Sequence, residues 1–273
     1  MFNKETSWLL STTWSNVMHK KYFFFDIDGT LAYGKPGQRI PPESAKYTVR
    51  KLQENGHFVA VATGRSYPTS IEFLNELGLH NMVCDGGNGI VIDDELLEVK
   101  PLDKEKCVRL INECKEKKIP WAFSYRIEKT RYSDSEKFKE ATGFYDMDVR
   151  VIEDLDPNDY EEIYKVYVAG EESELETLKE LPHCRYHDSY FFVEPTQKEK
   201  GIYRMMEYLK APLEDVVVFG DGLNDLSMFK DEWTSIAMGD GAEELKEKAD
   251  YVTDSAKNDG IYKACIKFGW IEE

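Results

Sequence analysis

The chain has 273 residues, 41% of them hydrophobic, and is therefore long enough to bury a substantial core and to form two domains. Its 52 Asp and Glu residues outnumber its 35 Lys and Arg residues, and the net charge of −17 argues against nucleic acid or an anionic membrane as a partner. The five scattered cysteines form no CxxC pair and no apolar run approaches the roughly 18 residues of a membrane helix, which favours a cytoplasmic protein without disulfides, zinc or a membrane span.

The N-terminal part of the chain alternates predicted strands and helices. Residues 22–27 are apolar and aromatic and run into a glycine turn at Asp28-Gly29, which predicts a buried strand. The elements expected next are a helix over 43–54, a strand over 58–62, a helix over 69–77 and a strand over 82–84. The glycine-rich segment 85–89 is expected to be a flexible joint.

The middle of the chain has a mixed α+β pattern, after which the alternation returns. The elements expected there are helices over 103–117 and 173–181 and strands over 121–126 and 163–168, followed by a helix over 200–210 and strands over 216–219, 235–238 and 251–253. The sequence therefore predicts an α/β fold with a Rossmann-like, doubly wound parallel sheet in the core, formed by residues 21–87 and 195–273. Residues 88–194 are expected to form an inserted α+β domain, and residues 1–20 an N-terminal extension without a secretory signal.

Polar residues follow three of the predicted core strands. They are Asp26 and Asp28, Thr63, and Asp221, Asn224 and Asp225. The carboxyl ends of parallel strands meet in one crevice, where four carboxylates would repel each other without a cation. Oxygen ligands of this kind predict a divalent metal, with Mg²⁺ the natural candidate. A single Asp-Gly pair is usually a turn, but the order of the DxDGT, TGR and GDGxND motifs, each after an apolar strand, favours a functional site.

These motifs resemble the haloacid dehalogenase superfamily and, within it, the Cof-type phosphatases. The matching stretches include Phe25–Leu31, Ala62–Arg65, Lys200-Gly201 and Phe219–Asp225, and the similarity extends from about Tyr22 to the end of the chain. The sequence departs from the branch at residues 85–89, where a plain Asn-Gly-Ala is usual.

The resemblance implies a role for each carboxylate. Asp26 would be the nucleophile and a metal ligand, while Asp28 would offer its backbone carbonyl to Mg²⁺ and its carboxyl as acid and base. Asp221 would complete the protein ligands, and Asp225 would hold either a coordinated water or the metal. The chemistry independently requires such a pair, because one carboxylate can attack phosphorus while a second protonates the leaving group and later activates water.

The remaining predicted site residues would bind the phosphoryl group. Thr63 and Gly64 are expected to bind its oxygens through a hydroxyl and an amide, and Asn224 is expected near the phosphate. Lys200 is favoured over its rival Lys198 to neutralise the charge, because it stands in a Lys-Gly pair. Arg65 could either contact substrate or pair with a carboxylate.

The sequence as a whole predicts a Mg²⁺-dependent phosphatase that hydrolyses small phosphorylated metabolites, such as sugar phosphates, through an aspartyl-phosphate. The inserted domain is expected to be a cap that closes over the site. The alternatives are a phosphomutase of the same superfamily and a regulatory homologue without turnover. The sequence leaves the oligomeric state open.

Overall fold

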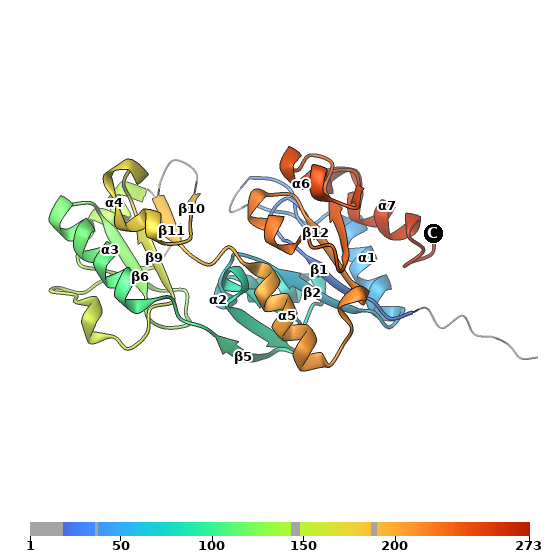
Figure 1. The fold of residues 1–273 in the computed structure, drawn as a ribbon, viewed down its shortest axis with the longest axis horizontal. Coiled ribbons are helices and arrows are strands. Elements are labelled where there is room, and N and C mark those ends of the chain that lie inside the picture. The colour runs from blue at the N-terminus through green and yellow to red at the C-terminus, as the bar shows by residue number, and fades with distance from the viewer. Residues whose placement is uncertain (1–18, 36–37, 143–147, 187–189) are drawn as a thin grey trace, which may run out of the picture.

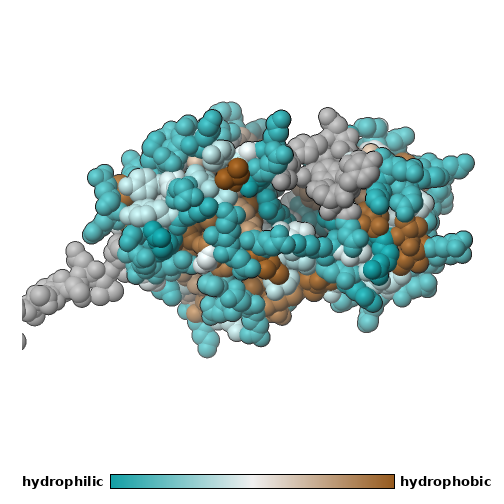
Figure 2. All heavy atoms as spheres, turned by 180° about the vertical axis from the view of Figure 1, so that it is seen from behind, coloured by the Kyte–Doolittle hydropathy of each residue, from teal (hydrophilic) through white to brown (hydrophobic). Residues whose placement is uncertain are grey.

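The computed structural model describes residues 19–35, 38–142, 148–186 and 190–273, so residues 1–18 of the predicted extension lie outside it. The described residues form two lobes, each built on its own sheet (Figure 1). None of the described helices is both long and apolar enough to cross a membrane. Hydrophilic residues cover most of the face shown in Figure 2, as expected for a net charge of −17.

The larger sheet forms the core and has the strand order β14-β13-β12-β1-β2-β3-β4-β5. Its strands are β1 Tyr22–Phe25, β2 Phe58–Ala62, β3 Met82–Cys84, β4 Gly89–Ile92, β5 Glu95–Val99, β12 Val216–Gly220, β13 Thr234–Ala237 and β14 Tyr251–Val252. Neighbours from β14 to β3 are parallel, whereas β4 and β5 continue the sheet antiparallel. The predicted parallel α/β core is therefore confirmed.

Helices cover both faces of this sheet because successive strand residues point to opposite sides. Phe23 and Phe25 of β1 belong to one apolar cluster, and Phe24 belongs to the other. The first cluster includes residues of α1 Glu43–Glu54, α2 Tyr67–Leu77 and α7 Gly260–Lys267, and the second includes residues of α5 Lys198–Leu209 and α6 Glu243–Lys248. This two-sided burial explains why the core strands read as continuous apolar runs.

The smaller sheet belongs to the inserted domain and has the order β10-β11-β9-β6-β7-β8. Its strands are β6 Trp121–Ser124, β7 Arg131–Ser133, β8 Val149–Val151, β9 Lys165–Val168, β10 His183–Tyr186 and β11 Tyr190–Val193. The helix α3 Lys104–Lys117 packs on one face, and the short helix α4 Lys137–Thr142 places Phe138 in a small cluster with Tyr167 on the other.

The sheet topology corrects the predicted start of the insertion. Strands β4 and β5 pair with β3, so residues 89–99 belong to the core sheet and the insertion begins at about residue 100 rather than at 88. The chain returns to the core between Glu194, whose amide bonds to Pro182, and Gln197, whose amide bonds to Gly86.

The segment 85–89 is not the flexible joint that its glycines suggested. Gly86 and Gly87 have φ angles of +61° and +107° and are buried. A Cβ atom on Gly86 would lie 1.6 Å from the Pro195 carbonyl oxygen, and one on Gly87 would lie 2.3 Å from that of Gln197. These glycines permit close backbone packing against the returning chain instead of providing freedom of movement.

The prediction of a helix over 173–181 is also wrong. Two short 3-10 segments, Glu172–Glu174 and Thr177–Glu180, stand there instead. Leu175, Leu178 and Leu181 are all buried and recur every three residues, which is the period of a 3-10 helix and not of an α-helix. The predicted helix over 43–54, in contrast, is confirmed with the same bounds.

Candidate active site

The site lies at the carboxyl ends of adjacent core strands. β1 and β12 are parallel neighbours that pair Phe25 with Phe219, and the amide of Asp26 bonds to the Phe219 carbonyl at 3.0 Å. Asp26 and Asp221 therefore leave the sheet side by side, as the sequence predicts for strand ends. One carboxylate oxygen from each of Asp26, Asp221 and Asp225 lies within 4.8 Å of the others.

A buried lysine holds two of these carboxylates. Lys198 Nζ donates to Asp26 Oδ1 and to Asp225 Oδ1, both at 2.6 Å. All three side chains are almost fully buried. Burial alone would lower the pKa of Lys198, but Asp225 and Asp26 raise that pKa above its usual value, so the ammonium stays charged.

The Asp225 carboxylate also organises its own loop. Its Oδ2 accepts hydrogen bonds from the amides of Asp221 and Gly222, each at 3.0 Å. With Oδ1 bound to Lys198, both oxygens of Asp225 already have protein partners. This arrangement favours the predicted indirect role of Asp225 at a metal, through a coordinated water, over direct ligation.

Asp221 is positioned by the turn that follows β1. Thr30 Oγ1 donates to Asp221 Oδ1 at 3.0 Å. Gly29 has a φ of +107°, and a Cβ atom there would lie 2.1 Å from Asp221 Oδ2. The glycine of the DxDGT motif is therefore required both for the turn and for the close approach of Asp221. The sequence reasoning gave Thr30 no role, although it belongs to that motif.

The charges of the cluster fit a divalent cation. Three carboxylates and one ammonium carry a formal charge of −2. Burial, and then the neighbouring Asp225, raise the pKa of Asp26 well above its ordinary value, and the same two causes raise the pKa of Asp221 to about 7. A hard cation with two positive charges would balance this repulsion, and carboxylate oxygens are the ligands that Mg²⁺ prefers.

The Asp28 side chain binds Arg65, whereas the Asp26 side chain binds Lys198. Its carboxylate receives two hydrogen bonds from Arg65, at 2.8 Å from Nε and 2.6 Å from Nη2, and lies 3.2 Å from Arg39 Nε. The Asp28 side chain is 38% exposed, so solvent reaches it. The contact gives Arg65 a carboxylate partner, one of the two roles that the sequence left open.

The predicted phosphate-binding turn, Thr63-Gly64-Arg65, follows β2. The Thr63 hydroxyl accepts a hydrogen bond from the Arg65 amide at 3.1 Å, so its own hydrogen can be donated to a phosphoryl oxygen. Thr63 is 1% exposed, and its amide bonds to Val83 at 2.9 Å. The start of the turn is therefore anchored to β3, beside the carboxyl end of β1.

The structure corrects the predicted preference for Lys200, because Lys198 is the lysine that contacts the carboxylates. Lys200 is exposed, whereas Lys198 is 1% exposed and contacts Asp26. Both lie in the first turn of α5, whose buried face carries Ile202 and Met205. Residue 198 precedes Ile202 by four positions and lies on this face, whereas residue 200 does not. The helical spacing of the buried residues, followed back to the first turn of α5, identifies Lys198 and not Lys200 as the inward-facing lysine.

Asn224, the last of the predicted phosphate-binding residues, is exposed beside the cluster. Its side-chain oxygen lies close to the backbone of Gly222: a Cβ atom added to Gly222 would lie 2.4 Å from Asn224 Oδ1. Its contact with phosphate or with the active-site lysine stays a prediction.

A model of haloacid dehalogenase-like hydrolases matches residues 23–265. The chain belongs to this family. YkrA of Bacillus subtilis, which is provisionally named a phosphatase, is 33% identical over 93% of this chain and 100% of its own length. The same organism's 5-amino-6-(5-phospho-D-ribitylamino)uracil phosphatase YcsE is 26% identical over 89% of this chain and 94% of its own. The solved structure of the subclass IIB sugar phosphatase BT4131 is 27% identical, with a TM-score of 0.73 over 92% of this chain and all of that one.

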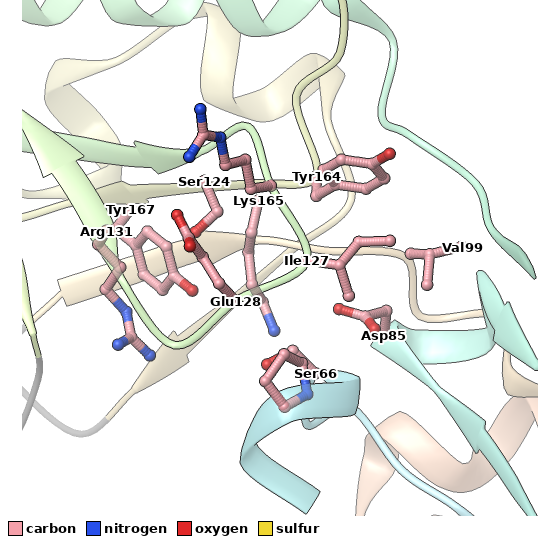
Figure 3. Close-up of a pocket in the computed structure, with 12 residues that line it drawn as sticks. Ser66, Asp85, Val99, Ser124, Ile127, Glu128, Arg131, Tyr164, Lys165 and Tyr167 are labelled. Atoms are coloured by element: carbon pink, nitrogen blue, oxygen red, sulfur yellow. The ribbon is translucent and has the colours of Figure 1, made fainter. Parts of the chain in front are cut away.

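Membership of this family confirms the resemblance and the enzyme class predicted from the motifs. A haloacid dehalogenase-like phosphatase also needs space for the leaving group, and the structure contains a pocket between the two lobes. The pocket is lined by Ser66, Pro68, Asp85 and Val99 of the core and by Ser124, Arg126, Ile127, Glu128, Arg131, Tyr164, Lys165 and Tyr167 of the inserted domain. Figure 3 shows Lys165 extending from the inserted domain toward Ser66 and Asp85.

Proposed function

We propose that this chain is a Mg²⁺-dependent phosphatase that hydrolyses small phosphorylated metabolites through an aspartyl-phosphate on Asp26. The observation that carries the proposal is the buried Asp26–Lys198–Asp225 cluster beside Asp221 at the carboxyl ends of β1 and β12, where the four side chains together have a formal charge of −2. A cluster of this composition is suited to a cation and a phosphoryl group and is costly without them.

Asp26 and Asp221 would hold the cation together with the backbone carbonyl of Asp28, and Asp225 would act through a coordinated water. Mg²⁺ bound there would draw negative charge from the phosphoryl oxygens and hold the group near Asp26. Lys198 would supply a second positive charge from within the protein, because its ammonium already contacts Asp26 at 2.6 Å. Thr63 and the Gly64 amide would bind the remaining phosphoryl oxygens.

The proposed reaction has two steps. In the first, an Asp26 carboxylate oxygen bonds to phosphorus while the bond to the leaving oxygen breaks, and Asp28 gives that oxygen a proton. In the second, Asp28 takes a proton from water, which attacks phosphorus and releases phosphate from Asp26. In the structure two hydrogen bonds from Arg65 orient the Asp28 carboxylate, the form that would take the proton from water in the second step.

The inserted domain would act as a cap whose pocket receives the leaving group. The lining of this pocket includes Ser66, Ser124 and Tyr167, polar residues that suit a hydroxylated leaving group such as a sugar. BT4131 is a sugar phosphatase, and YcsE acts on a phosphorylated ribityl compound, which supports the same substrate class. All five cysteines are unpaired, which supports the expected cytoplasmic location.

The proposed metal requirement predicts that EDTA abolishes hydrolysis of an aryl phosphate and that added Mg²⁺ restores it. Calcium should restore little activity, because its larger and looser coordination shell would misplace the phosphoryl group relative to Asp26. The measurement is kcat/KM for one aryl phosphate and several sugar phosphates after chelation and after addition of each ion. Full activity in EDTA would contradict the proposal.

Stabilisation by Mg²⁺ should depend on pH. The pKa of Asp221 is raised from its ordinary value of 3.8 to about 7 by burial and by Asp225, so the ionised side chain destabilises the metal-free folded protein above pH 7. That penalty shrinks as the pH falls from about 7 toward 3.8, the range in which the folded protein keeps the proton and the unfolded chain does not, and in this range Mg²⁺ must also displace the proton from Asp221. The increase in melting temperature caused by Mg²⁺ should therefore be larger at about pH 8 than at about pH 5.5. Equal increases at both values would argue against cation binding at Asp221.

A further inference from the structure

A buried ion pair joins the inserted domain to the phosphate-binding turn. Lys165 is the first residue of β9 in the inserted domain, and its Nζ lies 2.5 Å from Oε2 of Glu194, where the chain returns to the core. The same Nζ donates to the Gly64 carbonyl at 3.1 Å. Lys165 is 8% exposed and Glu194 is 4% exposed, so the pair is shielded from water.

The three carbonyl groups of the turn are held by different parts of the protein. Thr63 O accepts from the Gly86 amide at 3.2 Å, and Arg65 O accepts from the Asp85 amide at 2.9 Å. Both of these donors are backbone groups of the core. The carbonyl between them, that of Gly64, is bound by Lys165 of the inserted domain. The middle of the turn is therefore held by a side chain from the other lobe.

Gly64 is also shaped for this contact. A Cβ atom at Gly64 would lie 2.7 Å from Glu194 Oε1, so a side chain at this position would displace the Glu194 carboxylate from the turn. Glu194 fixes Lys165, and Lys165 fixes the peptide group whose carbonyl belongs to Gly64. The amide in that peptide group belongs to Arg65 and donates to the Thr63 hydroxyl at 3.1 Å, so rotation of the peptide group would redirect the hydroxyl that is proposed to bind a phosphoryl oxygen.

We propose that Lys165 and Glu194 are positioning residues that make the geometry of the phosphate-binding turn depend on docking of the inserted domain. This inference rests on the proposed phosphatase function. When the inserted domain is docked, Lys165 holds the Gly64 carbonyl and the turn has the orientation that binds phosphate. When it swings away, this bond is lost and the turn relaxes, so phosphate is released. The inserted domain thus acts on phosphate binding itself as well as on the leaving group.

A charge-neutral double variant tests this role. Lys165→Met with Glu194→Gln removes both charges of the pair, so the net charge near the phosphate is unchanged. Buried Asp85, which also interacts electrostatically with Lys165, keeps its hydrogen bond from the Tyr67 amide. Lys165→Met alone leaves Glu194 uncompensated beside the turn. The matched control is Lys129→Met, because Lys129 of the inserted domain also forms an ion pair with the core, at 2.6 Å from Glu72, but at an exposed position.

The measurement is the Kd of inorganic phosphate for the full chain with Mg²⁺, by calorimetry, together with kcat/KM for a small aryl phosphate. The double variant should bind phosphate about 10-fold more weakly than the unmodified protein, as expected for the loss of a hydrogen bond from a charged donor. Lys165→Met alone should bind at least as weakly as the double variant, because an unpaired carboxylate remains. The Lys129→Met control should stay within about twofold of the unmodified protein. A circular dichroism melt would check that each variant is folded.

The outcomes separate this inference from the proposed function. A double variant that binds phosphate as well as Lys129→Met would overturn the positioning role, even if the protein is an active phosphatase. Unchanged phosphate affinity with loss of activity only on substrates with large leaving groups would also overturn it, because Lys165 would then be a substrate contact. An unmodified protein that binds phosphate but hydrolyses nothing would contradict the proposed function, while the Kd comparison would still decide the positioning role.

Discussion

Asp26→Asn should reduce phosphatase activity by about 10⁴-fold or more, because an amide cannot form the aspartyl-phosphate and also weakens the cation site. The same substitution should raise the melting temperature of the metal-free protein. The pKa of Asp26 is raised by burial and by Asp225, which means that its negative charge is unfavourable in the folded protein without a cation. Loss of activity combined with higher stability would distinguish removal of a nucleophile from misfolding.

The control for this substitution is another buried aspartate on the same sheet. Asp215 directly precedes β12, at the opposite end of the strand from Asp221, and pairs with Lys21 at 2.7 Å. Asp215→Asn should lower stability but leave kcat/KM of the folded protein within a few-fold. The measurements are kcat/KM with Mg²⁺ and thermal melts in EDTA. Substantial turnover by Asp26→Asn in a preparation free of contaminating phosphatase would rule out the assigned nucleophile.

The core and its carboxylates could be predicted from the sequence because their signals are local. Each motif directly follows an apolar strand, and parallel strands bring their carboxyl ends together whatever the details of packing. Asp26, Asp221 and Asp225 accordingly lie within 4.8 Å of one another. The helix over 43–54 could be predicted equally well, since Pro42 and Asn55 mark its two ends.

The features that sequence reasoning missed depend on contacts between distant segments. The boundary of the insertion was misplaced because the glycines at 86 and 87 suggested a joint, whereas they accommodate Pro195 and Gln197, more than 100 residues away. Lys165 and Glu194 stand in the predicted insertion, and no local pattern connects them to Gly64. Only the docking of the two lobes makes them neighbours of the turn.

Substituting Lys198 should greatly reduce activity, whereas substituting Lys200 should not. Lys198→Met should lower kcat/KM by about 10²–10³-fold, the range typical for loss of a group that stabilises charge in the transition state. Lys200→Met is the matched control, because it removes the same charge two residues away on the exposed side of the same helix, and it should leave kcat/KM within about twofold.

The effect of Lys198→Met on stability should depend on the cation. Without Lys198, the carboxylates of Asp26 and Asp225 lose the ammonium that each contacts at 2.6 Å, and two buried negative charges remain close together. The melting temperature in EDTA should therefore fall, and Mg²⁺ should recover part of the loss by supplying positive charge to the same carboxylates. Lys200→Met should melt like the unmodified protein under both conditions. If Lys200→Met lost activity as severely as Lys198→Met, or if Lys198→Met retained full activity, the placement of Lys198 as the active-site cation would be wrong.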